Sequence, residues 1–532
     1  MGVDDILLKK WKFNTITGDV EPEKQEMCLF NNTAYACQLL NKHIKRNSVI
    51  ALHTDVDMDG LGSTYILKKF LESHNSSNHI YVINKDKIHG IQEKHVDYFN
   101  ENKIDLIIIT DSSTNELDTI KRFECDVLVI DHHEILHEET FGYCNNGSNQ
   151  FVIVNNTIDN KNYEYDESWV KESKNEAFKN ISRYIPTVEM SCGLVVYELL
   201  RVYCNYFSDE KILENLMLYQ WVGVTLLTDA IQLVNERNQW YIGKTVSTME
   251  TESTLKIMLD ALNGYKHSLD KSFINYTLAP LINKAIRAGA GSEALNVVIN
   301  NPKEIESLKV YSVQQDEAID KIIKLNKSFG KYVHIDITDE GINENYTGVI
   351  ASRLVGQHNK NAVVYKVKDG MAKGSFRGLD RDVDYRGIFD SHDNVFAQGH
   401  KAAFGFNLKE EKLHEIMEYI ADNTAARERK NYLSMGEMPE ELKGTYHIDS
   451  LEEFRRAGYM WRLAIGNSRV NSDNEINITV PASDVVLDRT IGKLYIYNVL
   501  GIECKAFNIL KGKYFNIYAE YSNEITFYIR DN

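Results

Sequence analysis

In the segment Val127-Leu-Val-Ile-Asp131-His132-His133-Glu134, an apolar run is followed by an aspartate and two histidines. Side chains of these types can coordinate metal ions and exchange protons. Four consecutive apolar residues, mostly β-branched, are typical of a strand buried within a parallel sheet. Such a strand delivers Asp131, His132 and His133 to its carboxyl end, where open α/β sheets bind ligands. Taken alone, the segment fits a strand end with hydrogen-bonded histidines as well as it fits a metal site.

An upstream segment has the same design, with an apolar run that ends in three alternate aspartates. It reads Val49-Ile-Ala-Leu-His53-Thr-Asp55-Val-Asp57-Met-Asp59-Gly60. Carboxylates crowded on one turn repel one another, and divalent cations remove that penalty. The alternative is a solvated acidic loop, but such a loop needs no hydrophobic strand directly before it. His53 is a further candidate ligand or a partner of the ligands.

A third apolar run, Leu106-Ile-Ile-Ile-Thr110, closes on Asp111. An aspartate that caps a strand decides nothing alone, but the three segments together predict a βαβαβ unit with its chemistry on one edge. Carboxylate oxygens mixed with imidazoles favour Mn²⁺ or Mg²⁺ over a structural zinc site. Two such ions, roughly 3.5 to 4 Å apart, would clamp the attacking and departing oxygens of a phosphate ester.

The length, charge and cysteine content limit the classes of protein to which this chain can belong. A chain of 532 residues has room for two or three domains, and its net charge of -17 argues against a broadly basic surface for nucleic acid. The seven cysteines are scattered and odd in number, as expected of reduced packing residues in a cytoplasmic protein. No apolar stretch has the length of a membrane span, so no membrane partner is expected.

The motif Asp-x-Asp-x-Asp-Gly at 55 to 60, with Asp111 and Asp131-His132-His133, resembles the first three motifs of the DHH phosphoesterases. Asp229 ends an apolar segment and would alone be interpreted as a cap. The residues that follow, 230 to 238, resemble the segment after the fourth motif of the RecJ exonuclease branch. This resemblance implies two divalent cations, Mn²⁺ or Mg²⁺, and a set of ligands: Asp55, Asp57, Asp59, Asp111, His132 and Asp229.

Later segments extend the resemblance to about residue 410. Residues 278 to 289, which include Arg287, are similar to the start of the RecJ bridging region, although Arg287 also fits a solvated helix face. Residues 371 to 377 and Gln398-Gly399-His400 resemble the DHH-associated domain, with Gln-Gly-His in place of its usual Gly-Gly-His. The resemblance implies that His133 and His400 contact the phosphate, and that the 5′-terminal phosphate is gripped by three side chains: Arg287, Ser375 and Arg377.

The predicted fold is α/β, built on a parallel sheet. The expected parts are an N-terminal extension (1–47), a DHH catalytic domain (48–240), a helical bridge (241–330), a smaller α/β DHH-associated domain (331–430) and a mostly β, OB-like C-terminal domain (431–532). In that last domain alternating strands carry tyrosines that either stack on bases or simply suit strands. They are Tyr495, Tyr497, Tyr518 and Tyr521.

The resemblance implies a RecJ-like exonuclease that removes nucleotides from the 5′ end of single-stranded DNA, in DNA repair and recombination. Its expected partners are single-stranded nucleic acid and repair or replication proteins. One alternative is a nano-RNase or cyclic-dinucleotide phosphodiesterase of the same superfamily. Another is a catalytically silent RecJ-like replication scaffold, but such scaffolds have lost acidic ligands that this chain retains.

Overall fold

The computed structural model divides the chain into two compact units. One unit comprises residues 22–230 and 241–429, and the other comprises 1–21, 231–240 and 430–532. Among the described helices, none is both long and apolar enough to cross a membrane. The structure describes residues 28–30, 32–76, 78–84, 89–135, 144–146, 149–157, 190–208, 211–229, 231, 236–263, 273–324, 329–380, 383–424, 477–491, 494–499, 502–521 and 525–531.

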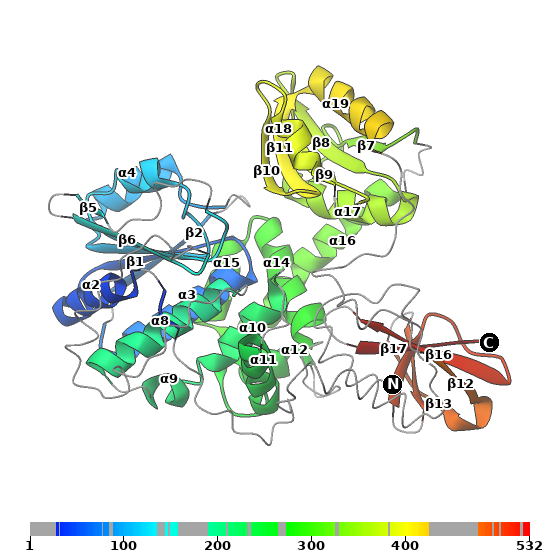
Figure 1. The fold of residues 1–532 in the computed structure, drawn as a ribbon, viewed down its shortest axis with the longest axis horizontal. Coiled ribbons are helices and arrows are strands. Elements are labelled where there is room, and N and C mark those ends of the chain that lie inside the picture. The colour runs from blue at the N-terminus through cyan, green and yellow to red at the C-terminus, as the bar shows by residue number, and fades with distance from the viewer. Residues whose placement is uncertain are drawn as a thin grey trace, which may run out of the picture. The chain divides into compact units, whose positions relative to one another are not determined.

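The larger unit contains a six-stranded sheet in the order β2-β1-β3-β4-β6-β5 (Figure 1). All neighbouring strands are parallel except β5, which is antiparallel to β6 at one edge. The α/β fold with a parallel sheet, predicted from the apolar runs, is therefore confirmed. The strands are β1 (Ile50–Thr54), β2 (His79–Ile83), β3 (Leu106–Thr110), β4 (Asp126–Asp131), β5 (Cys144–Asn146) and β6 (Asn149–Asn155).

The register of this sheet aligns the carboxyl ends of its central strands. Thr54 of β1 pairs with Thr110 of β3, and Thr110 pairs with Ile130 of β4. Because the three strands end at one level, the residues that follow them emerge at the same edge.

Helices cover both faces of the sheet, which explains why its central strands are buried throughout and mostly apolar. On one face α3 packs on β1, α8 on β4 and α2 on β6, while α10 packs on α3 and α8. On the other face Val96 and Phe99 of α4 join Ala51, Ile107 and Val127 in one core. The helices are α2 (Thr33–Arg46), α3 (Met58–Ser73), α4 (Glu93–Glu101), α5 (Leu117–Ile120), α8 (Cys192–Phe207), α9 (Lys211–Asn215) and α10 (Tyr219–Thr228).

A run of helices links this sheet to a second one. It includes a short π-helix, η3, directly before α14, the helix that ends at Arg287. The elements are α11 (Glu236–Thr248), α12 (Thr254–Asn263), η3 (Ile274–Leu278), α14 (Ala279–Arg287), α15 (Gly291–Ile299), η4 (Pro302–Leu308) and α16 (Lys309–Ile323).

The second sheet has the order β10-β11-β9-β8-β7, with only β7 and β8 parallel. Residues of α17 pack in one core with β7 and β8, and residues of α18 and α19 pack in another with β9 and β11. The elements are β7 (Val333–Asp336), η5 (Glu344–Tyr346), α17 (Thr347–His358), β8 (Ala362–Lys368), β9 (Met371–Arg377), α18 (Tyr385–Asp390), β10 (Phe396–His400), β11 (Ala403–Lys409) and α19 (Glu410–Asn423).

The smaller unit contains a sheet in the order β12-β16-β17-β15-β14-β13. Only Ala482–Asp484 separates β12 from β13, and these two strands lie at opposite ends of that order. If β12 and β13 are counted as one bent strand, that strand pairs with β16 on one side and with β14 on the other. The strand order then forms a closed ring, as expected of an OB-like domain. The strands are β12 (Asn477–Pro481), β13 (Val485–Ile491), β14 (Leu494–Val499), β15 (Ile502–Ala506), β16 (Tyr514–Tyr521) and β17 (Ile525–Asp531).

The tyrosines predicted to stack on bases have different positions in this sheet. Tyr497 is buried, and its hydroxyl accepts a hydrogen bond from the backbone N–H of Leu510 at 3.0 Å. Tyr497 therefore packs in the core, as the alternative interpretation holds. Tyr495 is half-buried, and the side chains of Tyr518 and Tyr521 lie outside the described residues.

Candidate metal centre

Acidic residues follow the aligned ends of β1 and β3. Asp55 and Asp111 come directly after these strands, and Asp131 is the last residue of β4. All three are almost fully buried, with exposures of 1%, 2% and 1%. Buried carboxylates require hydrogen bonds or cations to compensate for the lost hydration.

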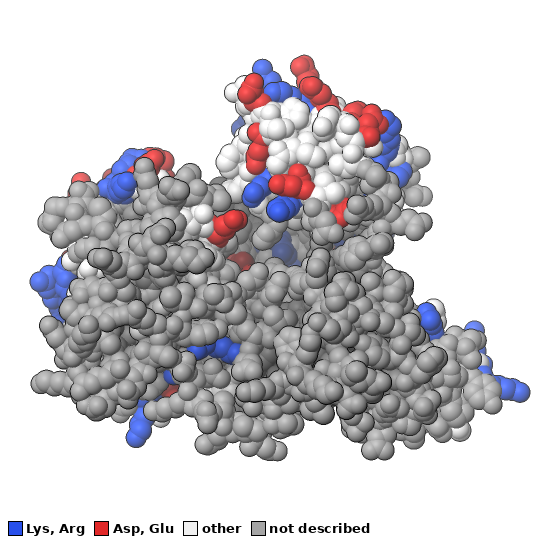
Figure 2. All heavy atoms as spheres, in the orientation of Figure 1, with Lys and Arg blue, Asp and Glu red and all other residues white. Residues whose placement is uncertain are grey.

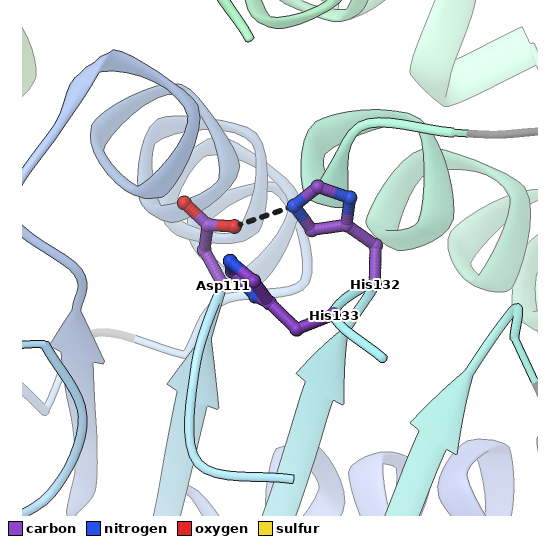
Figure 3. Close-up of side chains that lie close together, drawn as sticks. All are labelled: Asp111, His132 and His133. Atoms are coloured by element: carbon purple, nitrogen blue, oxygen red, sulfur yellow. Dashed lines mark ion pairs between the residues drawn. The ribbon is translucent and has the colours of Figure 1, made fainter. Parts of the chain in front are cut away.

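Asp111 faces His132 across this edge (Figure 3). The backbone of Asp111 has φ +65°, a left-handed conformation that Asp tolerates, and its N–H donates to the carbonyl of Ile130. Asp111 Oδ1 lies 3.1 Å from His132 Nε2. Among the described residues this buried oxygen has no hydrogen-bond partner. An unsatisfied carboxylate oxygen beside an imidazole nitrogen is a suitable ligand pair for a cation.

His132 stands among further carboxylates. Its Nε2 lies 3.7 Å from Asp59 Oδ2 and 3.6 Å from Asp229 Oδ2. Asp229 caps the carboxyl end of α10, where its N–H donates to the carbonyl of Thr225 at 3.0 Å. Helix α10 thereby brings an acid from a distant part of the sequence to the sheet edge.

The N-termini of two helices hold the acidic turn. Asp57 caps α3, and its Oδ1 accepts from the N–H groups of Asp59 and Gly60 at 3.0 and 3.2 Å. The Asp59 carboxylate accepts at 2.7 Å from Cys192 N–H and at 2.9 Å from Gly193 N–H, both at the start of α8. These contacts fix the turn while leaving carboxylate lone pairs for a cation.

Crowding raises the pKa of two of these acids well above the usual value. For Asp59 the causes are burial, then the charges of Asp229 and Asp57. For Asp111 they are burial, then the charges of Asp59 and Asp57. Ionising all of these acids together is therefore unfavourable, and a divalent cation would offset that cost.

The predicted ligands lie within one cluster of potential metal ligands. Three groups of side chains bring ligand atoms within 4.8 Å of one another, and each group contains Asp111 or His132. The groups are Asp111, His132 and His133; Asp59, His132 and Asp229; and Asp55, Asp57 and Asp111. Hard oxygen ligands with one or two imidazoles fit Mn²⁺ or Mg²⁺.

Asp131 holds His133 beside this cluster. Asp131 Oδ1 accepts from His133 Nδ1 at 2.8 Å and from the backbone N–H of His132 at 2.7 Å. Burial works to lower the pKa of His133, but Asp131 outweighs it and raises that pKa to about 10. The side chain of His133 is 52% exposed, so a cationic imidazole faces outward next to the acids.

Two arginines predicted to bind phosphate lie close enough to influence each other. Burial and the charge of Arg287 lower the pKa of Arg377 to about 10. Burial also lowers the pKa of Arg287, while the charge of Asp57 raises it. Among the described residues, no carboxylate forms an ion pair with either guanidinium. Paired, half-buried guanidiniums without a carboxylate partner are suited to bind an anion.

Hydroxyl groups surround Arg377 at the end of β9. Its Nε donates to Ser352 Oγ at 3.2 Å, and its Nη1 donates to the carbonyl of Phe376 at 2.7 Å. The hydroxyl of Ser375 lies 3.0 Å from that of Thr347, at the start of α17. The structure thus brings Ser375 and Arg377 together with Arg287 in one neighbourhood.

The structure does not place two of the histidines named in the sequence analysis at the metal cluster. His400 is the last residue of β10, but its side chain lies outside the described residues, so its role stays a prediction. His53 is fully buried, and its ring packs edge-on against His95 at 4.8 Å between centroids. His53 belongs to none of the potential metal groups among the described residues.

Comparison with known families identifies the domain that carries this cluster. The model of the "DHH family, N-terminal domain" matches residues 47–219. These residues form a DHH domain. The match includes β1 to β6, the acidic turn and the paired histidines, while Asp229 lies beyond it.

Relatives that match about three quarters of the chain include single-strand-specific exonucleases. The chain is 22% identical over 435 residues to a putative SPbeta prophage-derived single-strand DNA-specific exonuclease, YorK, of Bacillus subtilis (strain 168), covering 72% of this chain and 67% of YorK. It is also 22% identical over 423 residues to the single-stranded-DNA-specific exonuclease RecJ of the same organism. That match covers 74% of this chain and 48% of RecJ.

Solved structures show the same fold. The crystal structure of RecJ from Thermus thermophilus in complex with Mn²⁺ has a TM-score of 0.63 at 14% identity, covering 94% of this chain and 71% of that one. An exonuclease RecJ bound to manganese has a TM-score of 0.57 at 17% identity, covering 75% of this chain and 96% of that one. The chain is therefore RecJ-like in fold.

Sequence reasoning missed one contact and one residue of the DHH domain that support the site. Asp131 was seen as part of a motif, but its function of orienting His133 depends on a hydrogen bond that spacing does not reveal. His89 contacts Asp55 from a loop after β2. No apolar run leads directly into His89, so no sequence signal set it apart from surface histidines.

Proposed function

We propose that the chain is a metal-dependent exonuclease that hydrolyses phosphodiester bonds from the 5′ end of single-stranded DNA. The observation that carries this proposal is the position of His132, whose Nε2 lies within 4 Å of carboxylates from three different elements. A phosphodiesterase of the DHH family needs such a site, and the relatives named above act on single-stranded DNA.

Two divalent cations, Mn²⁺ or Mg²⁺, are the proposed cofactors. When bound, they would supply Lewis-acid stabilisation of the phosphate charge and activate water. Their ligands would be Asp55, Asp57, Asp59, Asp111, His132 and Asp229.

The residues around the cluster have separate proposed functions toward the substrate. Asp131 fixes the ring of His133, which is cationic and half exposed, so that it donates a hydrogen bond to an oxygen of the scissile phosphate. His400, which follows Gly399 at the end of β10, is proposed to contact the same phosphate.

Arg287, Ser375 and Arg377 are proposed to bind the terminal 5′-phosphate. Two guanidiniums and a hydroxyl offer several N–H and O–H donors to one phosphate. Since a pocket of this kind accepts one end of a strand, it would set the direction of degradation. The negative charge of Asp57 raises the pKa of Arg287, so the proposed phosphate pocket is close enough to the acidic turn to interact with it electrostatically.

An assay with Mn²⁺ on single-stranded DNA and RNA, labelled at either the 5′ or the 3′ end, tests the proposal. The expected result is early release of the 5′ label as mononucleotide from DNA. Preferential hydrolysis of a dinucleotide or a cyclic dinucleotide would instead favour the small-substrate phosphodiesterases. Absence of hydrolysis on every substrate would favour the silent scaffold.

Arg377→Ala tests the phosphate pocket. The variant should lose its preference for 5′-phosphorylated over 5′-hydroxyl ends, roughly 10- to 100-fold, because charge-assisted hydrogen bonds are removed. Mn²⁺ binding should be unchanged. Lys368→Ala, which removes a positive charge at the other end of the same β8–β9 hairpin, is the matched control. Equal loss of activity on both kinds of end would refute this function of Arg377.

A further inference from the structure

Three helices that carry or hold proposed metal ligands, α3, α8 and α10, pack against one another (Figure 1). The acidic turn leads into α3, the start of α8 holds the carboxylate of Asp59, and α10 ends at Asp229. With His132, these two acids form one group of potential metal ligands. The packing of the three helices therefore sets how far apart the two carboxylates lie.

Thr225 of α10 lies where the three helices meet, and it is fully buried. A Cβ on Gly62 of α3 would clash with the methyl group of Thr225, and a Cβ on Gly193 of α8 would clash with its hydroxyl. A larger residue at either position would force the helices apart. The backbones of α3 and α8 thus approach Thr225 as closely as glycine allows.

The hydroxyl of Thr225 also joins α10 to the first residues of α8. Its oxygen lies 2.9 Å from that of Ser191, the N-cap of α8, and its proton is donated to the carbonyl of Val222 at 2.9 Å. Because a hydroxyl has one proton, Ser191 is the donor in the bond to Thr225. The oxygen of Ser191 accepts from the N–H of Leu194 at 3.3 Å. One chain of hydrogen bonds therefore runs from α8 to α10.

Both ends of this chain are next to proposed ligands. Ser191 directly precedes the two N–H groups of α8 that hold the Asp59 carboxylate. The carbonyl of Thr225 accepts from the N–H of Asp229 at 3.0 Å, one turn later in α10. The hydrogen bond between Ser191 and Thr225 thus connects the support of one acid to the support of the other.

We propose that Thr225 is a positioning residue of the metal centre. Its hydroxyl, through Ser191, fixes Asp229 relative to Asp59 so that both carboxylates reach a cation beside His132. The inference rests on the proposed function, because it takes these acids as metal ligands. It adds a determinant of metal affinity that acts through the two helices and contacts neither cation nor substrate.

Three substitutions separate this hydrogen bond from the packing around it. Thr225→Val keeps the size of the side chain but leaves the hydroxyl of Ser191 without its acceptor. Thr225→Ser keeps the hydroxyl and removes the methyl group. Ser191→Ala removes the same hydrogen bond from the side of α8, so the proposal can still be tested if a buried valine prevents folding.

Thr245→Val is the matched control, because Thr245 of α11 makes the same kind of contact with α10. Thr245 is fully buried, its hydroxyl donates to the carbonyl of Tyr219 at 3.1 Å, and a Cβ on Gly223 would clash with it. Tyr219 begins α10, whereas Asp229 caps its other end. This variant should therefore unfold at a lower urea concentration and bind Mn²⁺ as the wild type does.

The readouts are Mn²⁺ affinity by electron paramagnetic resonance and the urea midpoint of unfolding in EDTA. We expect Thr225→Val and Ser191→Ala to bind Mn²⁺ roughly 10- to 100-fold more weakly, as when residues that orient metal ligands are lost. Thr225→Ser should bind Mn²⁺ close to the wild-type value. Wild-type affinity in either of the first two variants, once folded, would overturn the proposal. An equal loss in Thr225→Ser or Thr245→Val would also overturn it, because helix packing in general would then be the cause.

Mn²⁺ binding is measured without hydrolysis, which keeps this inference distinct from the proposed function. A wild-type protein that binds Mn²⁺ but hydrolyses no nucleic acid would refute the exonuclease, while the comparison of variants would still decide on Thr225. A wild-type protein that binds no Mn²⁺ would overturn both.

Discussion

Asp111 is the residue on which the candidate metal centre depends most. It is 2% exposed, its Oδ1 lacks a hydrogen-bond partner among the described residues, and burial with neighbouring acids raises its pKa. A buried carboxylate without a compensating cation destabilises the metal-free protein. Removing this carboxylate should therefore weaken metal binding but increase the stability of the metal-free protein.

Asp111→Asn tests both expected effects, on stability and on metal binding. In EDTA the variant should be more stable than wild type by roughly 1 kcal/mol or more, because a repelled, buried charge is removed. Its Mn²⁺ affinity should fall by about 100-fold or more, since even residues around metal ligands account for 10- to 100-fold. Urea unfolding in EDTA and electron paramagnetic resonance measure the two effects.

Asp105→Asn is the control for this change, because Asp105 precedes the same strand, β3, at its other end. Its carboxylate is exposed and accepts a hydrogen bond from the N–H of Val49, which the amide oxygen of Asn can also accept. The account would be wrong about Asp111 if both variants bound Mn²⁺ as wild type does.

At the residue scale, the sequence identified side chains better than it identified their contacts. Asp111 could be predicted because it ends an apolar run, but its left-handed backbone follows from a hydrogen bond to β4. Asp59 was predicted only as a ligand, and its bonds to the start of α8 connect residues 133 positions apart. Contacts of that range depend on how helices pack and leave no local pattern.

At the scale of elements, the turn between β1 and α3 is set by a close approach of its backbone. A Cβ on Gly60 would lie 2.8 Å from both the backbone nitrogen and the carbonyl oxygen of Asp55. Backbone atoms cannot move aside as a flexible side chain can. Gly60 therefore allows Asp55, Asp57 and Asp59 to share one tight turn.

Gly60→Ala should lower the free energy of unfolding by roughly 1–3 kcal/mol through overpacking, and should weaken Mn²⁺ binding by displacing the turn. Denaturant unfolding and a Mn²⁺ titration measure these changes. Gly330→Ala is the control, since nothing lies within 4 Å of a Cβ there, and it should change stability by no more than about 0.5 kcal/mol. If Gly60→Ala were as stable as the wild type, the close approach between residue 60 and the backbone of Asp55 would be contradicted.

The start of β4 is tied to α2 through Asp126. Its Oδ2 accepts from Lys42 Nζ at 2.5 Å and from His43 Nε2 at 2.8 Å, and its Oδ1 accepts from the N–H of Gln150. Burial alone would raise the pKa of Asp126, but these bonds outweigh it and lower the pKa to about 2. The ionised carboxylate therefore stabilises the fold.

Asp126→Asn should cost roughly 1–2 kcal/mol at neutral pH. Because the folded-state pKa lies below the ordinary value of 3.8, this stabilisation is complete above about pH 4 and is lost as the pH falls toward 2. The stability gap between wild type and variant, measured by urea unfolding, should thus narrow below about pH 4. A gap that stays constant across this range would contradict the assignment.

Elements differ in how far the sequence predicts them. Strands β1, β3 and β4 could be predicted because they are buried at every position and so are largely apolar. Strand β2 was not predicted, and four of its five residues are only half-buried. The end of α10 at Asp229 could not be told from an ordinary cap without the resemblance to the RecJ branch. The OB-like order of the smaller unit depends on pairing between distant strands, which alternation alone does not specify.

For the whole molecule, the net charge of -17 must be reconciled with an anionic substrate. On the face drawn in Figure 2, acidic and basic side chains intermingle over the described surface around the second sheet. A mixed surface offers no broad attraction for DNA, so local cationic groups must bind the phosphates. The proposed groups, Arg287, Arg377 and His133, all lie in the larger unit.

The central claim is that this unit holds divalent cations between Asp111, His132 and the acids around them. Crystals grown with Mn²⁺ and measured at the manganese absorption edge test it directly. The account predicts anomalous density between Asp111, His132 and Asp229, and further density beside Asp55 and Asp57. A well-ordered site without anomalous density, in crystals that contain saturating Mn²⁺, would contradict it.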